Sequence, residues 1–152
     1  ELYFSIDDIS SRFEYQRTGA NWEKVCNNIE IMKKIMPHNH MFNVNCVWSL
    51  LNLYYLDEVF DWYNATLKTN RNGDPSNFIL QKAVGETEIK NLTESSLDVL
   101  KNKFSLHPRL FDLVKSIPKG TEDNQVFWNY INKLDSIRNT EFRKVPEWSL
   151  LI

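Results

Sequence analysis

The sequence predicts an α/β fold: half of a parallel β/α barrel with about three strands, flanking helices and a helical C-terminal tail. Strand-like and helix-like segments alternate along the first half of the chain, as in sheets whose parallel strands are joined by helical crossovers. The first two predicted strands each have one polar face, whereas strands covered by helices on both sides are nearly continuous apolar runs. A polar face suits a barrel whose inner side lines a ligand cavity.

The first strand is predicted at residues 2–7, where apolar and polar side chains alternate with a period of two. A polar loop is expected after it, ending near Gly19. A helix is then expected from Trp22 to Met36, because apolar residues recur there at helical spacing. Asn21 is a suitable N-cap for this helix.

The second strand is predicted at residues 41–48 and the third at residues 77–83. Asn52 is expected to cap a helix between them. Further helices are predicted to begin at Thr93 and Pro108, and a last one to span residues 122–139. We therefore expect residues 1–85 to form the half barrel and residues 86–152 a helical extension packed on it as one structural domain.

The composition excludes several classes of protein. A chain of 152 residues that is 42% hydrophobic has the apolar material for one packed core. A net charge of −2 argues against a strongly basic nucleic-acid binder. No apolar run reaches the length of a membrane span and no secretory signal is visible, so a cytoplasmic location is expected. Cys26 and Cys46 are interpreted as reduced, buried thiols.

The same strands carry a family resemblance. Phe4-Ser-Ile-Asp7, followed by Tyr15-Gln-Arg17-Thr-Gly19, resembles the fourth strand and following helix of radical SAM enzymes, which use S-adenosylmethionine (SAM). The segment from Asn43 to Asn52 is similar to the fifth strand and its helix. Residues 134–138, Phe142 and Pro146-Glu147 resemble the end of the twitch subgroup. The resemblance spans most of the chain in the order of the family.

The resemblance implies that polar residues at the strand ends form part of a SAM site. The candidate cofactor-binding residues are Ser5, Asp7, Arg17, Asn43, Asn45 and Asn52. Ser5 and Asp7 are expected near the ribose or carboxylate of SAM, and Arg17 offers a planar fork of donors to a carboxylate. Each residue also has a structural alternative. Ser5 and Asp7 would end the strand, and Arg17 would be a surface residue. Asn43 and Asn45 would bond to neighbouring backbone, and Asn52 would cap a helix.

The family's iron–sulfur motif is missing. Radical SAM enzymes hold a [4Fe–4S] cluster through Cys-x-x-x-Cys-x-x-Cys, and Cys26 and Cys46 do not have that spacing. No cofactor is therefore expected in this chain, with SAM and the cluster belonging to the intact parent enzyme. His38 and His40 are interpreted as an exposed loop and not as a metal pair. The chain is expected to be a fragment that is inactive on its own.

A non-catalytic alternative stays open. A half barrel leaves a strand edge unpaired, and such edges pair with other chains. The chain would then be a partial-barrel interaction module that self-associates or binds a protein partner. A homo-oligomer formed through the first strand is expected, with neither nucleic acid nor membrane as a partner.

Overall fold

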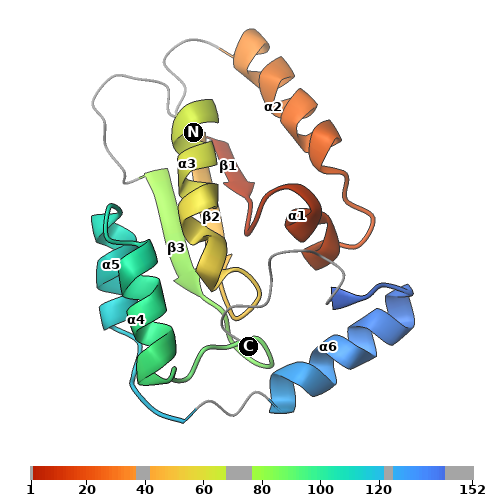
Figure 1. The fold of residues 1–152 in the computed structure, drawn as a ribbon. Coiled ribbons are helices and arrows are strands. Elements are labelled where there is room, and N and C mark those ends of the chain that lie inside the picture. The colour runs from red at the N-terminus through yellow and green to blue at the C-terminus, as the bar shows by residue number, and fades with distance from the viewer. Residues whose placement is uncertain (1, 37–41, 68–76, 122–124, 143–152) are drawn as a thin grey trace. The chain divides into compact units, whose positions relative to one another are not determined.

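The computed structural model describes residues 2–36, 42–67, 77–121 and 125–142. Figure 1 shows strands and helices alternating in the first half of the chain, followed by helices alone. The elements are β1 Leu2–Ser5, α1 Ser10–Gln16, α2 Trp22–Ile35, β2 Phe42–Trp48, the 3-10 helix η1 Leu53–Tyr55, α3 Leu56–Thr66, β3 Phe78–Lys82, α4 Glu94–Lys103, α5 Pro108–Lys115 and α6 Gln125–Arg138. None of the helices in these ranges has the length and apolar character needed to cross a membrane.

The three strands form one parallel sheet in the order β1-β2-β3, flanked by helices as in part of a β/α barrel. This confirms the predicted fold class. In the register between β1 and β2, Tyr3 lies opposite Asn43 and Ser5 opposite Asn45. Directly opposed residues point to the same side of a sheet. The predicted polar face is therefore one continuous face shared by two strands.

The chain divides into two compact units. The first consists of Glu1–Val47 and Glu58–Gln81, and the second of Trp48–Asp57 and Lys82–Ile152. The first unit contains nearly all of the sheet together with α1, α2 and most of α3, whereas the second contains η1 and α4 to α6. The chain therefore passes from the first unit into the second at the end of β2 and returns to the first unit within α3. The sequence pattern did not predict this division.

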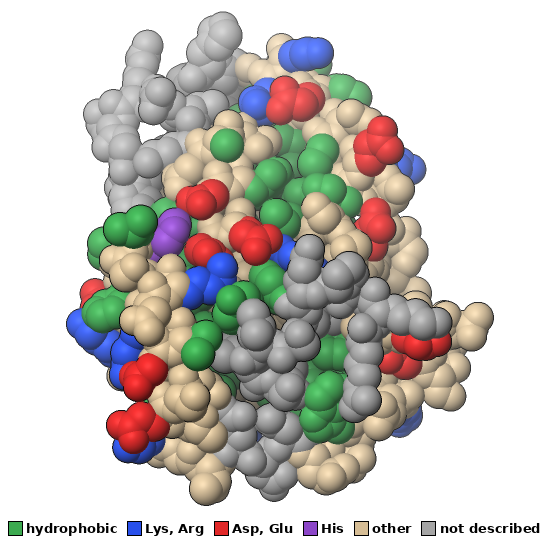
Figure 2. Space-filling view, in the orientation of Figure 1, with side chains coloured by type: hydrophobic (Ala, Val, Ile, Leu, Met, Phe, Trp, Pro, Cys, Tyr) green, Lys and Arg blue, Asp and Glu red, His purple; other side chains and the backbone are tan. Residues whose placement is uncertain are grey.

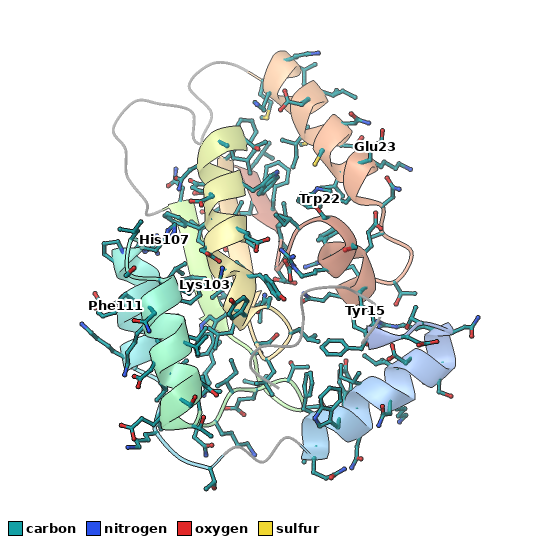
Figure 3. The ribbon with its side chains drawn as sticks, in the orientation of Figure 1. Tyr15, Trp22, Glu23, Lys103, His107 and Phe111 are labelled. Carbon is teal, nitrogen blue, oxygen red and sulfur yellow. The ribbon has the colours of Figure 1, made fainter. Side chains whose placement is uncertain are left out.

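Aromatic contacts join the helices of the first unit. The ring of Trp22, which Figure 3 shows at the start of α2, lies 5.1 Å from the ring of Phe13 on α1 and 5.1 Å from that of Trp62 on α3. On the sheet, Phe78 of β3 is fully buried and packs edge-on against Phe60 of α3 at 5.3 Å. Such pairs add about 0.5–1.5 kcal/mol each beyond the area they bury.

The loop predicted after β1 is wrong, because residues 10–16 form the helix α1. A helix of 7 residues is too short to be stable by propensity alone. Phe13 and Tyr15 are buried, and so is the polar residue Arg12. Tertiary contacts therefore stabilise a helix whose composition indicates a loop.

Several predicted helix ends are confirmed by their capping bonds. The Asn21 side chain accepts a hydrogen bond from the Lys24 backbone N–H at 2.7 Å. Thr93 caps α4 in the same way, and Pro108 occupies the first turn of α5. A polar N-cap satisfies a backbone N–H that the helix leaves without a partner.

In the second unit, the end of α4 is attached to the start of α3. The Lys103 ammonium donates to Asp57 Oδ2 at 2.6 Å and lies 4.7 Å from the centroid of the Tyr54 ring. His107 lies at the junction of α4 and α5. It is the one histidine among the described residues, and Figure 2 shows its side chain in purple at the surface. This arrangement fixes α4 through one charged contact that is mostly shielded from solvent.

Helix α6 ends in a left-handed residue, Asn139, with a φ of 53°. The Thr140 backbone N–H donates to the Asp135 carbonyl at 3.1 Å, and the Asp135 carboxylate accepts from the Phe142 N–H at 2.7 Å.

We expect Asn139→Gly to preserve the stability of the second unit. Asn139→Val should lower the free energy of unfolding by about 1–2 kcal/mol, because β-branched residues are strained at positive φ. Chemical denaturation of both variants tests this, and equal stabilities would contradict it.

Candidate functional site

The carboxyl end of β1 is bound to Arg17, the residue that ends α1. Arg17 Nη2 donates to Ser5 Oγ and to Asp7 Oδ2, both at 2.8 Å. Asp7 Oδ1 accepts a hydrogen bond from the Val47 backbone N–H at 2.9 Å. The structure therefore brings three of the predicted residues together at one end of the sheet.

Asn45 lies on the same polar face, opposite Ser5. Its Oδ1 atom is buried and has no hydrogen-bond partner among the described residues, and the same holds for Arg17 Nε. A buried polar atom without a partner costs about 1–3 kcal/mol. This face therefore contains one donor and one acceptor that are unsatisfied and are covered by neighbouring atoms.

The two remaining predicted residues have structural contacts. Asn43 is 5% exposed and donates to the Leu2 carbonyl at 3.4 Å, a long hydrogen bond. Asn52 is fully buried in the second unit, where its Oδ1 accepts from the Ser49 backbone N–H at 2.8 Å. Its side chain makes no capping bond to η1, so Asn52 closes the turn after β2 and does not cap the following helix.

The sequence interpretation missed a second polar cluster in the first unit, which we call the Asp8 cluster: Asp8, Arg12, Gln16 and Glu58. Asp8 Oδ1 accepts from Arg12 Nε at 2.9 Å, and Asp8 Oδ2 accepts from Gln16 Nε2 at 3.0 Å. Arg12 Nη2 also donates to Glu58 Oε2 on α3 at 2.6 Å. The spacing of four between Asp8, Arg12 and Gln16 was the available signal, since residues four apart share one face of a helix. In the structure Arg12 and Gln16 lie on α1, and Asp8 precedes it.

Burial raises the pKa of Asp8 to about 7, although Arg12 and the Ile9 backbone N–H act to lower it. Asp8 is 0% exposed and Arg12 only 4%, so water solvates neither charge well. Burial acts to lower the pKa of Arg12, but Asp8 and Glu58 outweigh it and raise that pKa. The cluster therefore contains a permanent cation beside a carboxyl group that titrates near neutral pH.

The two cysteines do not fit an iron–sulfur cluster. Cys46 is fully buried, and burial, Asp7 and Asp8 together raise its pKa well above the usual thiol range. Burial and Glu30 also raise the pKa of Cys26. Iron binds thiolates, so both environments oppose ligation. Among the described residues no group of three or more His, Cys, Asp or Glu is placed to hold a metal, and His38 and His40 lie outside those residues.

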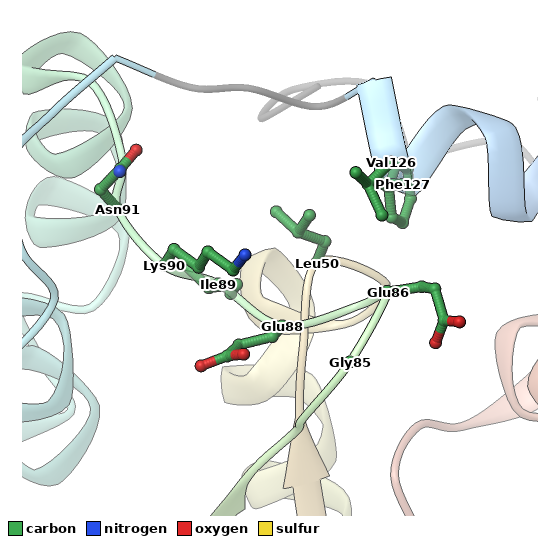
Figure 4. Close-up of a pocket in the computed structure, with 9 residues that line it drawn as sticks. All are labelled: Leu50, Gly85, Glu86, Glu88, Ile89, Lys90, Asn91, Val126 and Phe127. Carbon is green, nitrogen blue, oxygen red and sulfur yellow. The ribbon is translucent and has the colours of Figure 1, made fainter.

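The second unit contains a cavity of about 140 Å³ (Figure 4). The loop after β3, Leu50 and the first turn of α6 line it, with Val126 and Phe127 facing Leu50. Of the two acidic residues that line it, Glu86 and Glu88, the second is paired with Lys82 at 3.1 Å. Sites for drug-sized ligands and cofactors enclose about 300–1,000 Å³, so this cavity is too small for one. A second, more open hollow of about 340 Å³ lies against α6 and is lined by Trp128, Ile131 and Phe142 together with polar residues. We place the candidate site on the polar face of β1 and β2.

We predict that Arg12→Met lowers the free energy of unfolding by about 3–5 kcal/mol at pH 8, since it leaves a buried carboxylate without its cation. The loss should be smaller at pH 5, where Asp8 is protonated. Denaturant unfolding at both pH values measures the difference. The control is Lys24→Met at an exposed position of α2, expected within about 0.5 kcal/mol of the parent. Equal losses for the two variants would contradict the prediction.

Comparison of the chain with protein-family models, with curated proteins and with solved structures finds no match.

Proposed function

We propose that the polar face at the carboxyl ends of β1 and β2 is part of a SAM site, and that the chain is a fragment of a radical SAM enzyme. One observation supports this most directly. Arg17 is held between Ser5 and Asp7 at 2.8 Å, while its Nε and the Oδ1 of Asn45 lack partners among the described residues. A hydroxyl group both donates and accepts hydrogen bonds. Both atoms are buried, so the proposal requires that neighbouring side chains move to let a ribose hydroxyl of the nucleoside reach either of them.

The position of this face also supports the proposal. In open sheets of parallel strands, ligands bind outside the carboxyl ends of the strands. Ser5 is the last residue of β1, and Asp7 lies two residues beyond it. The face also carries a permanent cation in Arg17, which can pair with the carboxylate of the methionine part of SAM.

The proposal assigns no catalysis to this chain alone. When SAM and a reduced cluster are bound together, they supply a 5′-deoxyadenosyl radical in the family that the sequence resembles. Cys26 and Cys46 do not fit the cluster, so no reaction step is assigned to them. The role proposed for Ser5, Asp7, Arg17 and Asn45 is to bind and orient the nucleoside and amino-acid parts of SAM.

We expect S-adenosylhomocysteine, the demethylated analogue of SAM, to bind weakly, because only part of the site is present. It should shift the side-chain NMR signals of Arg17 Nε–H and Asn45 Nδ2–H₂ in a ¹⁵N-labelled sample. Arg17→Leu should abolish the Asn45 shift, whereas Lys24→Leu on the exposed side of α2 should not. Adenosine and methionine, titrated separately, distinguish ribose recognition from carboxylate recognition. No shift at millimolar ligand, or an Asn45 shift unchanged in Arg17→Leu, would contradict the proposal.

The origin in a radical SAM enzyme has its own test. The source reading frame is expected to encode Cys-x-x-x-Cys-x-x-Cys upstream of this segment. Anaerobic reconstitution with iron and sulfide should then give visible absorbance for the extended protein and none for this chain. An upstream frame without the motif would remove the enzyme part of the proposal and leave nucleoside binding to be judged by the titration.

One observation favours the interaction module as a second candidate. Within the part of the chain that the structure describes, β1 pairs with β2 alone and is an edge of the sheet. Its Tyr3 side chain is 56% exposed, and Leu2 and Phe4 are only half-buried although they lie on the apolar face. Exposed strand edges with apolar side chains pair with other chains.

If β1 mediates self-association, the chain should be a dimer or larger at tens of micromolar. Tyr3→Lys should then shift it toward the monomer, because an edge lysine opposes strand pairing. Sedimentation velocity or light scattering measures the mass of both. Val84→Lys provides a matched control at an exposed apolar position of the second unit. A clean monomer of the parent chain at that concentration would rule out this candidate.

A further inference from the structure

The Asp8 cluster holds the helix that carries Arg17. Asp8 follows β1, whereas Arg12 and Gln16 lie on α1. The bonds from Asp8 to both residues and from Arg12 to Glu58 tie α1 to the end of β1 and to α3. Arg17 is the C-cap of α1 and follows Gln16 directly. The position of the Arg17 guanidinium beside Ser5 therefore depends on α1 being docked.

We infer that the Asp8 cluster is a proton-responsive clasp, in which the proton on Asp8 determines how firmly α1 and Arg17 are held against the sheet. The docking of α1 follows from the geometry of the first unit alone. The consequence for a ligand, which is regulation of the Arg17 site by pH, rests on the proposed function.

The hydrogen bonds of the cluster depend on the charge of Asp8. An ionised carboxylate is an acceptor only, and here it receives donors from Ile9 N, Arg12 Nε and Gln16 Nε2. A protonated carboxyl group presents an O–H, which cannot face the amide N–H₂ of Gln16. The Gln16 amide can rotate so that its oxygen accepts this proton. Protonation thus changes the last residue of α1, directly before Arg17.

The charges around Asp8 come from each element that packs on it. Arg12 on α1 lowers the pKa of Asp8, and Glu58 on α3 raises it, but burial dominates and raises it to about 7. Asp7 precedes Asp8 and is paired with Arg17. Cys46 on β2 lies near both carboxyl groups, and its raised thiol pKa keeps it neutral in this range. Asp8 is therefore the group of the cluster that titrates near neutral pH.

The direction of the effect follows from linkage. The Asp8 pKa is raised in the docked state relative to about 3.9 in a solvated chain, so the docked state binds the proton more tightly. Docking is then fully favoured below about pH 4 and weakens as the pH rises toward 7. Above that pH it stays constant at its weaker value.

The entry to α1 also favours release. Ser10, the first residue of the helix, has a φ of 54°, in the left-handed region. A non-glycine residue pays a conformational penalty there and keeps that φ only while surrounding contacts hold it. Undocking of α1 relieves this strain. The hydrogen bonds of the Asp8 cluster therefore have to offset the conformational cost of Ser10 at every pH.

Hydrogen exchange tests the clasp without any ligand. The backbone amide of Arg17 donates to the Phe13 carbonyl at 3.0 Å, and that of Phe13 to the Ile9 carbonyl at 3.3 Å. After correction for intrinsic exchange, their protection should fall by up to about tenfold per pH unit between about pH 5 and pH 7. Asp8→Asn should remove this slope. Asp61→Asn, the same change at an exposed position of α3, should keep it.

A flat profile in the parent chain, or an unchanged slope in Asp8→Asn, would overturn the inference. Should Asp8→Asn fail to fold, a carbon NMR titration of the Asp8 carboxyl group in the parent chain decides instead. A midpoint near 7 supports the clasp and one near 4 overturns it. If the exchange slope is found but S-adenosylhomocysteine does not bind, the clasp stands and the proposed function fails. If S-adenosylhomocysteine binds but the exchange slope is absent, the proposed function stands and the clasp fails.

Discussion

The first unit depends on how two consecutive carboxyl groups, Asp7 and Asp8, are satisfied where β1 ends. Successive side chains of an extended segment point to opposite sides. Asp7 joins Ser5 on the polar face and receives the Val47 N–H and the Arg17 guanidinium. Asp8 points into the protein, is 0% exposed and receives Arg12.

Each of the two carboxyl groups is paired with an arginine of the short helix α1 or its C-cap, and these two pairs determine where α1 lies. Arg12 is spaced to reach Asp8, and Arg17 is placed at the helix end to reach Asp7. A buried ion pair is not by itself a source of stability, because removing two charges from water costs several kcal/mol per ion. Its structural effect is specificity: α1 has one position in which both cations are matched.

The sequence predicts the regular parts of this fold because they follow from local rules. Alternation along residues 2–7 and 41–48 identifies β1 and β2, and a polar residue before an apolar run identifies the caps at Asn21 and Thr93. The polar face of the sheet could also be predicted, since the period of two holds in both strands. These features depend on neighbours a few residues apart.

What the sequence could not predict depends on partners distant in the chain. Glu58 lies 46 residues from Arg12, so the residues around α1 look like a polar loop until that partner is known. The burial of Asp8 has the same origin, because nothing local distinguishes it from the more accessible Asp7. Asn52 illustrates the opposite error: its type and position suit a cap, but the turn at Ser49 uses its side chain first.

The contrasting environments of the two cysteines give the first unit its own reporter of opening. Cys26 is partly accessible on α2, whereas Cys46 is 0% exposed and its sulfur lies 3.6 Å from the Asp7 carbonyl oxygen. Thiol reagents attack the thiolate, so a sealed thiol reacts only when the structure around it opens. Alkylation of Cys26 would thus follow the native surface. The rate of Cys46 alkylation would report how often the sheet itself opens, without any added label.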